Sequence, residues 1–285
     1  MLRLNAYAKI NLFLDIEGRR TDGFHDILSV MQTVSLSDTV TLWRTEKGIE
    51  VSNDIGIEKE RDLTYRAAAA FFAACGKDGG VRIKVDKRIP MGAGLAGGSA
   101  DAAAVLRGLN EIYGEPFSKG ELAKIGLTLG SDVPFCVIGG TKITRGRGEQ
   151  MTDMPDMPNC SMVIAIGDDH VSTPAQFAEL DRRFDNFVGY KPKSENVKGI
   201  ENAFLCGEFD VSEKLYNIFE ITGRFSPEIK EIMMKNSACG TLMSGSGSSV
   251  FGIFSDSTDA KKAADELINK GYRAFVCKPI NEEEI

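Results

Sequence analysis

The sequence predicts an α+β protein of two domains, and three observations support this. Strand-like and helix-like segments follow one another irregularly, without the regular alternation of a doubly wound sheet. The length of 285 residues suits one large domain or two ordinary ones. Residues 149–159 are rich in Met, Pro and Asp and have neither a helical nor a strand period. We therefore predict an N-terminal domain over residues 1–150 and a C-terminal domain over residues 155–285.

The first predicted strand covers residues 2–16. Every even position from Leu2 to Ile16 is apolar, and mainly polar residues fill the positions between them. This period of two predicts a long strand with one buried face and one solvated face. Lys9 and Asn11 share the solvated face, so their side chains should project from it together. Further apolar or alternating runs predict strands over residues 38–43, 81–85, 135–138, 161–166, 249–254 and 272–277.

Three segments have the helical period. Between residues 99 and 113, apolar residues recur at spacings of three and four, which predicts a helix with one buried stripe. Ser118 and Glu121 have the spacing of a capping box, so a second helix should begin there and end before Gly130. A third helix should run from residue 258 to residue 270 and end at Gly271.

Charge and hydrophobic patterning exclude several classes of protein. With 41 acidic and 34 basic residues, the net charge of −7 repels a phosphate polyelectrolyte, so we expect no nucleic acid partner. The longest apolar run, Ala67–Cys75, has nine residues, whereas a membrane-spanning helix needs about 20. The N-terminal residues alternate and contain no apolar signal core. We therefore expect a cytoplasmic protein with no membrane partner.

The number and spacing of the cysteines and histidines exclude further kinds of catalytic site. The six cysteines are at least 24 residues apart, so no CxxC pair is available for zinc or thiol exchange. They are expected to be reduced, buried thiols. His25 and His170 are too few for a histidine-rich metal site. The chemistry must therefore use carboxylates, lysines, hydroxyls or the backbone.

A glycine-rich loop is the strongest functional signal. Residues 90–101 read Pro-Met-Gly-Ala-Gly-Leu-Ala-Gly-Gly-Ser-Ala-Asp and connect a predicted strand to a helix that starts near Ser99. Small residues let backbone amides approach an anion closely, and a helix N-terminus adds free N–H donors. The loop therefore indicates phosphate binding. A flexible loop before a helix capped by Ser99 is the alternative interpretation.

Two known phosphate loops fit these residues only in part. Gly92, Gly94 and Gly97 satisfy G-x-G-x-x-G, but the preceding strand carries alternating charges and so has a wet face. The Walker pattern fails because Gly98 occupies the position of its lysine. A nucleotide site here would need a cation from elsewhere in the chain. Lys9 could supply it, or could be a solvated lysine on a strand face.

Two further segments have a structural and a functional interpretation. Asp132 follows a predicted helix end and precedes an apolar run, so it could bind nearby backbone amides in a turn. It could equally project into a cleft. The small-residue segment Ser244–Ser249 precedes a predicted strand and offers backbone and hydroxyl donors.

Taken together, these segments resemble the GHMP kinases. The matching pieces are residues 8–12, 18–25, 90–101, 130–135 and 244–249, in that order along the chain. The resemblance implies an N-terminal domain similar to the second domain of ribosomal protein S5. It also implies a ferredoxin-like C-terminal domain and an active cleft between the two.

The resemblance implies ATP as the phosphoryl donor, with Mg²⁺ beside its phosphates. The implied ATP-binding residues are Pro90, Met91, Gly92, Ala93, Gly94, Leu95, Ala96, Gly97, Gly98, Ser99 and Ala100. Ala96 and Ala100 stand where relatives often carry Gly and Ser, but alanine is small enough for the loop. The nucleotide site is therefore expected to be intact.

The resemblance also implies the acceptor. Lys9 and Asp132 match the catalytic pair of the family, with Asp132 as general base and Lys9 polarising the hydroxyl. The positions that line the cytidine diphosphate side of the pocket are Asn11, Phe24, His25, Thr173 and Phe177. Phe24 replaces a tyrosine of some relatives and keeps the stacking face. The implied small-molecule substrate is a cytidine diphosphate-linked methylerythritol, phosphorylated on its 2-hydroxyl in isoprenoid precursor synthesis.

Two other functions compete with this one. The chain could be a GHMP kinase for a simpler alcohol, such as homoserine or mevalonate, and recognition of cytosine by Phe24, His25 and Phe177 would separate the two. It could also be a nucleotide-binding protein without catalysis, against which the presence of both Lys9 and Asp132 argues. The sequence fixes neither the oligomeric state nor the metal ligands.

Overall fold

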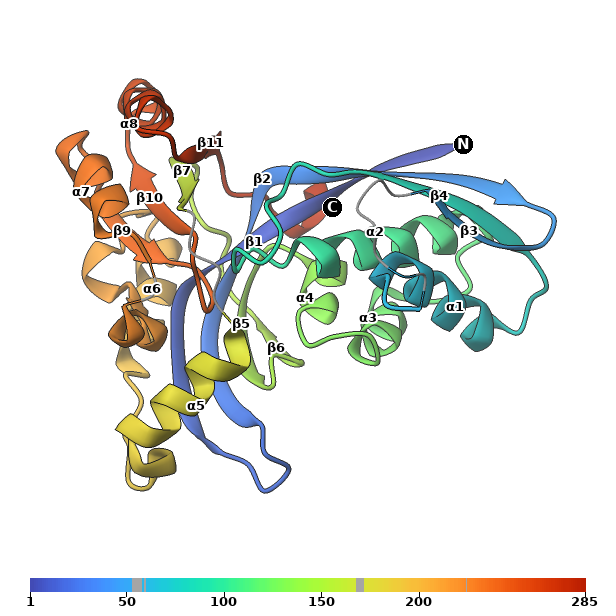
Figure 1. Cartoon of the computed structure of the whole chain (residues 1–285), viewed down its shortest axis with the longest axis horizontal. Helices are drawn as coiled ribbons and strands as arrows, with labels where there is room; N and C mark the ends of the chain where they lie inside the picture. The colour runs from blue at the N-terminus through green and yellow to red at the C-terminus, as the bar shows by residue number, and fades with distance from the viewer. Residues whose placement is uncertain (53–57, 59, 168–171, 224) are drawn as a thin grey trace.

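The computed structural model describes residues 1–52, 58, 60–167, 172–223 and 225–285. Two β-sheets, each with its own helices, make up an elongated molecule (Figure 1). His170 lies outside the described residues. Within the described part of the chain, no helix has both the length and the apolar character that crossing a bilayer requires.

The first sheet is built on a long antiparallel hairpin of β1 (Leu2–Arg19) and β2 (His25–Thr45). Its strands follow the order β3-β4-β2-β1-β8, and β5 pairs with the first half of β2 and with β6. The remaining strands are β3 (Gly48–Ser52), β4 (Gly80–Asp86), β5 (Thr141–Gly146), β6 (Gln150–Asp153) and β8 (Tyr216–Asn217).

Four helices cover one face of this sheet (Figure 1). They are α1 (Leu63–Cys75), α2 (Gly97–Ile112), α3 (Lys119–Leu127) and α4 (Val133–Ile138). The central helix α2 is buried along residues 100–106, which are mostly alanine, so it packs closely on the sheet. A Cβ atom on Gly108 would lie 2.5 Å from a methyl group of Leu42 on β2, which shows how close this approach is. The buried helix holds its N-terminus at a fixed place beside β1.

The second sheet is antiparallel, with the strand order β11-β7-β10-β9. Its strands are β7 (Ser161–Ile166), β9 (Gly240–Met243), β10 (Val250–Phe254) and β11 (Arg273–Cys277). The helices α7 (Pro227–Lys235) and α8 (Ser257–Asn269) pack on it. In chain order this is a 4-1-3-2 arrangement, as in ferredoxin-like folds. The sheets and helices confirm the predicted α+β class.

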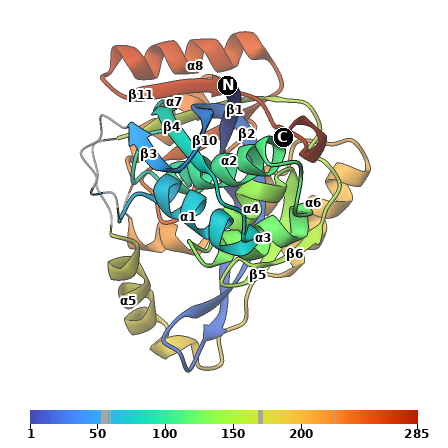
Figure 2. The same cartoon turned by 90° about the vertical axis from the view of Figure 1, so that its right-hand side faces the viewer.

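Segments of the C-terminal half also join the first sheet. β8 pairs in parallel with β1, and the Ile280 amide donates to the Thr33 carbonyl at 2.9 Å. The C-terminal half also contains α5 (Thr173–Arg183) and α6 (Glu195–Leu205), of which α5 stands beside the turn of the β1–β2 hairpin (Figure 2). The expected boundary at 149–159 includes β6, which pairs within the first sheet. The division into residues 1–150 and 155–285 stays a prediction.

Several predicted elements are confirmed. The expected strands at 81–85, 161–166, 249–254 and 272–277 match β4, β7, β10 and β11 to within one residue at each end, and the expected strand at 38–43 covers only part of the longer β2. The expected helices correspond to α2, α3 and α8. The capping box at the start of α3 is present, because the Ser118 amide donates to the Glu121 carboxylate at 2.8 Å and Ser118 Oγ accepts from the Glu121 amide.

The predicted strand at 135–138 is wrong. These residues belong to α4, which begins with Pro134 in its first turn and ends at Gly139 with φ 76°. A short apolar run has the same pattern in a buried strand and in a helix that is buried on most sides. Phe135, Cys136 and Val137 are all buried, so the apolar run belongs to the core although it is helical.

The expectation of a solvated second face on β1 is also wrong from Ala8 onward. Alternation of exposure holds up to Tyr7, but Lys9, Asn11 and Phe13 are all buried. Residues more than 170 positions away cover them: the Asn11 amide donates to Ser244 Oγ at 3.3 Å, and Tyr216 packs against Phe13. The second face of the strand is therefore an internal surface of the protein.

All six cysteines are free thiols, as expected, but not all are buried. Cys206 is exposed, and Cys75 and Cys239 are half-buried. The prediction of six buried thiols was therefore wrong for these three.

Candidate active site

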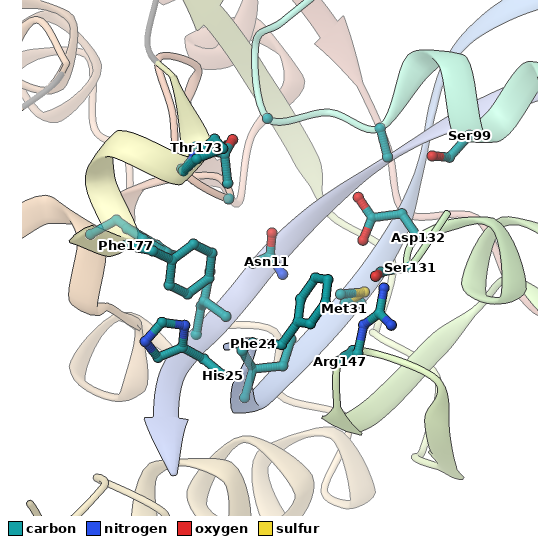
Figure 3. Close-up of a pocket in the computed structure, with 18 of the residues that line it drawn as sticks. Asn11, Phe24, His25, Met31, Ser99, Ser131, Asp132, Arg147, Thr173 and Phe177 are labelled. Carbon is teal, nitrogen blue, oxygen red and sulfur yellow. The ribbon is translucent and has the colours of Figure 1, made fainter. Parts of the chain in front are cut away.

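A pocket of 710 Å³ opens between β1, the glycine-rich loop and α5 (Figure 3). This volume is typical of small-molecule sites. The predicted site residues that line it are Lys9, Asn11, Phe24, His25, Gly92, Gly94, Ala96, Ser99, Asp132, Thr173 and Phe177. The structure thus brings together predicted residues that lie up to 168 positions apart, from Lys9 to Phe177.

Seven residues predicted to bind ATP do not line this pocket. Ala93, Leu95 and Ala100 are buried in the core, while Pro90, Met91, Gly97 and Gly98 complete the loop outside the lining. The loop residues therefore divide into those that face the cavity and those that fix the loop to the protein.

The glycine-rich loop is held by β1 and by the segment 244–249. The Lys9 amide donates to the Leu95 carbonyl at 3.2 Å, and Ser244 Oγ donates to the Gly94 carbonyl at 3.2 Å. Gly94 has φ 77°, and a Cβ atom there would lie only 2.3 Å from the Ser244 carbonyl oxygen. Only glycine fits where the two loops meet.

The loop runs directly into the N-terminus of α2. The helix begins at Gly97, two residues earlier than predicted, and Ala96 precedes it with φ 57° and no side-chain cap. The alternative interpretation, in which Ser99 caps the helix, is therefore wrong on this point: Ser99 lies in the first turn, on the pocket wall. Uncapped N–H groups and the positive end of the helix dipole favour an anion at this place.

Lys9 is held in the pocket wall by a chain of hydrogen bonds. Only 4% of the residue is exposed, and its Nζ donates to Asn11 Oδ1 at 2.7 Å. Asn11 Nδ2 in turn donates to Ser29 Oγ at 2.8 Å, and Ser29 Oγ donates to the Phe13 carbonyl at 2.6 Å. Asn11 thus fixes the position of the lysine, which has no carboxylate partner in the ion pairs of the described residues.

Asp132 immediately precedes α4, and its side chain extends toward the pocket (Figure 3). Its carboxylate makes no capping hydrogen bond to the helix. This absence disfavours the turn interpretation, which requires such a bond. Burial raises the pKa of the nearby Cys136 thiol, Asp132 raises it further and Lys9 lowers it, so both charges act on the same buried position.

The far end of the pocket is aromatic. His25 lies parallel to Phe177, with ring centroids 4.6 Å apart, and Phe219 packs edge-on against Phe177 at 4.9 Å. Phe24 lies on the opposite side and is 49% exposed (Figure 3). Two ring faces for a planar group are therefore present, although His25 covers part of the Phe177 surface.

The sequence analysis missed Asp181, which fixes His25. The two side chains lie 2.6 Å apart, from His25 Nε2 to Asp181 Oδ1. A carboxylate only accepts, so Nε2 donates to Asp181, and in the tautomer that carries its proton on Nε2 the Nδ1 atom is an acceptor. Asp181 lies four residues after Phe177 on α5, on the same helix face. This spacing would have revealed it had α5 been predicted.

Thr173 connects the pocket to the segment 244–249. Its hydroxyl lies 2.7 Å from Ser246 Oγ, and Gln176 Nε2 donates to the Ser246 carbonyl. The start of α5 is therefore joined to the same loop that holds Gly94.

Comparison with known proteins identifies this arrangement. The family described as GHMP kinases N terminal domain matches residues 62–140, and GHMP kinases C terminal matches residues 203–274. A relative from Caldicellulosiruptor saccharolyticus, named 4-diphosphocytidyl-2-C-methyl-D-erythritol kinase, is 40% identical and is aligned over 93% of this chain and 92% of its own.

Solved structures agree. A crystal structure of 4-(cytidine 5'-diphospho)-2C-methyl-D-erythritol kinase has a TM-score of 0.78 and 31% identity, over 98% of this chain and 99% of its own. Homoserine kinase from Cytophaga hutchinsonii has a TM-score of 0.71 over 98% of this chain and 95% of its own, but at 17% identity it shares the fold alone. The chain is therefore a GHMP kinase, a small-molecule kinase that uses ATP. Within that class it belongs to the 4-diphosphocytidyl-2-C-methyl-D-erythritol kinase family.

The contact between the two loops leads to a prediction. We expect Gly94→Ala to raise the KM for ATP by about tenfold, because a Cβ atom at 2.3 Å from the Ser244 carbonyl must displace the loop. Steady-state kinetics with ATP as the varied substrate measure this. Gly120→Ala is the control, since a Cβ atom there meets nothing within 4 Å. An ATP KM unchanged in Gly94→Ala would show that the contact does not position the loop.

Proposed function

We propose that this protein transfers the γ-phosphoryl group of ATP to the 2-hydroxyl of 4-diphosphocytidyl-2-C-methyl-D-erythritol, in the non-mevalonate route to isoprenoid precursors. The observation that carries the proposal is a single pocket with three distinct regions. One wall is an uncapped helix N-terminus, the middle holds Lys9 and Asp132, and the far end is aromatic with a fixed histidine. Each region suits one part of the two substrates.

The phosphates of ATP fit the glycine-rich loop and the start of α2. Phosphoryl transfer needs positioning and neutralisation of charge more than covalent chemistry. The backbone N–H groups of Gly97, Gly98 and Ser99, in the first turn of α2, supply donors at a helix start that has no side-chain cap. The proposed ATP-binding residues are accordingly those of the segment 90–100, with the cavity-facing members in contact with the phosphates.

Asp132 is the proposed general base. It accepts the proton of the C2 hydroxyl while the oxygen forms its bond to the γ-phosphorus and the bond to the ADP oxygen breaks. Lys9, held by Asn11, donates a hydrogen bond to the same hydroxyl oxygen and stabilises the charge that develops there. A general base typically contributes a factor of about 10² to 10⁴.

Mg²⁺ is proposed as the companion of ATP. Mg²⁺ prefers oxygen ligands and is usually held by one or two side chains together with substrate phosphates. Among the described residues no cluster of three or more Asp, Glu, His or Cys forms a cage of its own. The Ser99 hydroxyl on the pocket wall fits such a partial ligand set. When bound, the ion neutralises phosphate charge.

The aromatic end is the proposed cytosine site. Phe24 and Phe177 offer faces for stacking, which is worth about 1 to 3 kcal/mol per base. His25 Nδ1, an acceptor because Asp181 binds Nε2, matches the exocyclic amine of cytosine. Uracil presents a carbonyl oxygen at that position, so two acceptors would face each other. Asn11 and Thr173 complete the proposed substrate lining.

A coupled assay for ADP release with a panel of alcohols tests the proposed function. We expect rapid turnover with 4-diphosphocytidyl-2-C-methyl-D-erythritol and none with homoserine, mevalonate or free methylerythritol. Turnover with one of the simpler alcohols alone would replace this function by the second interpretation. Nucleotide binding without turnover on any alcohol would favour the noncatalytic protein.

Base preference is a separate prediction. We expect calorimetric titration to show CMP binding about tenfold or more tighter than UMP, because the wrong base leaves a buried acceptor unpaired. His25→Ala should abolish this preference, and Asp181→Ala should reduce it by releasing the ring. ATP affinity is the control and should not change. Equal binding of CMP and UMP by the unmodified protein would contradict the placement of cytosine.

A further inference from the structure

The described pocket lining contains one lysine, Lys9, and one arginine, Arg147. Lys9 donates a hydrogen bond to Asn11, and its proposed role is at the alcohol end of the cavity. Arg147 comes from the turn between β5 and β6 and was not singled out by the sequence analysis. The proposed reaction has no assigned use for it.

The guanidinium group of Arg147 is held in position by a neighbouring ring, but it has no ion-pair partner among the described residues. Its Cζ lies 3.9 Å from the centre of the Phe24 ring, which fixes the group by a cation–π contact. Its Nε is buried and has no hydrogen-bond partner, and none of the ion pairs among the described residues includes Arg147. The charge of Arg147 helps to lower the pKa of the Asp22 carboxyl, but that carboxylate already forms an ion pair with Arg20.

Arg145, two residues earlier, behaves differently. It lies on β5, forms an ion pair with Glu17 and is 46% exposed. It does not belong to the pocket lining. The unused donors of Arg147 are therefore a property of its position and not of arginines in this segment.

The location of Arg147 matches one group of the substrate. Figure 3 shows the guanidinium between Phe24 on one side and Ser131 and Asp132 on the other. The substrate has a base at one end, an alcohol at the other and a diphosphate between them. With the base at Phe24 and the alcohol at Asp132, the diphosphate must pass the place that Arg147 occupies.

We propose that Arg147 binds the diphosphate of the cytidine substrate and so sets the preference for a diphosphate over a bare nucleoside. This inference rests on the proposed function and adds the residue that recognises the diphosphate in the middle of the substrate. A guanidinium group offers a planar fork of N–H donors that fits two phosphate oxygens at once. Its contact with Phe24 places that fork before the ligand arrives, so little side-chain freedom is lost on binding.

Calorimetric titration of cytidine, CMP and CDP tests the inference. In the unmodified protein CDP should bind about tenfold or more tighter than cytidine. Arg147→Met keeps an unbranched apolar stem over Phe24 but removes the charge. It should lose most of this difference, while its cytidine affinity stays within about threefold. Arg147→Lys should recover part of the difference, because it keeps the charge without the fork. Arg145→Met is the matched control and should behave as the unmodified protein.

Kinetics provide the second readout. Arg147→Met should raise the KM for the cytidine substrate about tenfold and leave the KM for ATP unchanged. An equal loss of cytidine and CDP affinity would show that Arg147 only holds the Phe24 ring in place, and this would overturn the inference. A raised KM for ATP alone would assign Arg147 to the nucleotide donor instead. Failure of the unmodified protein to phosphorylate the cytidine substrate would overturn the proposed function, which the variants do not test.

Discussion

Asp132→Asn is expected to lower kcat by about 10² to 10⁴ while the KM values for both substrates change little. The amide has nearly the shape of the carboxylate, so binding should survive. It cannot accept the proton of the C2 hydroxyl, and this affects only the transition state. Because the Asp132 side chain makes no capping hydrogen bond to α4, the fold should not depend on its charge.

Single-turnover and steady-state kinetics, with thermal unfolding as a check of the fold, measure this effect. Asp86→Asn is a suitable control, since Asp86 is 52% exposed and pairs only with Lys84 among the described ion pairs. A variant of Asp132 that keeps more than about a third of the original turnover would show that the carboxylate is not the base.

The elements that were predicted best from the sequence are those whose pattern depends on residues close to them in the chain. The capping box at Ser118 and the apolar stripe of α2 are local, and both are present. α5 was not predicted because its only buried residues are Gln176 and Leu180, which form no apolar stripe. The first half of β2 was missed because buried polar residues such as Ser29 and Gln32 interrupt its pattern.

The site shows the same limit. The period of β1 correctly placed Lys9 and Asn11 on one face, and their side chains are in contact. The pattern could not show that this face is buried, because the covering residue Ser244 lies 233 positions away. Arg147 lies in the sequence Arg-Gly-Arg-Gly, where nothing distinguishes it from Arg145. Only the fold separates the arginine in the pocket from the one that is solvated.

A second charged cluster supports the start of α2 and leads to the other large expected effect. Lys87 Nζ donates to Asp101 Oδ2 at 2.7 Å and also binds Asp38, which is fully buried. Asp101 Oδ1 is buried without a partner. A Cβ atom on Gly97 would lie 3.3 Å from Lys87 Nζ, so the cluster directly underlies the glycine-rich loop. Burial raises the pKa of Asp101 from 3.8 to about 7.

This raised pKa fixes the direction of a pH effect. Between pH 4 and pH 7 folded Asp101 holds a proton that the unfolded chain has released, so its contribution to stability is lost as the pH rises through this window. Above it, Asp101 is ionised, and Lys87 is the cation that it shares with Asp38. Removing that cation should therefore be most harmful at high pH.

Lys87→Met is expected to lower the free energy of unfolding by about 3 to 5 kcal/mol at pH 8, because two buried carboxylates lose their cation. At pH 5 the loss should be smaller, since Asp101 is then protonated in the folded state. Urea unfolding at both pH values measures the difference. Lys84→Met is the matched control: its pair with Asp86 is about half exposed, so its loss should be at most about 1 kcal/mol. An equal loss for Lys87→Met at both pH values would mean that the lysine acts through the packing of its stem and not through its charge.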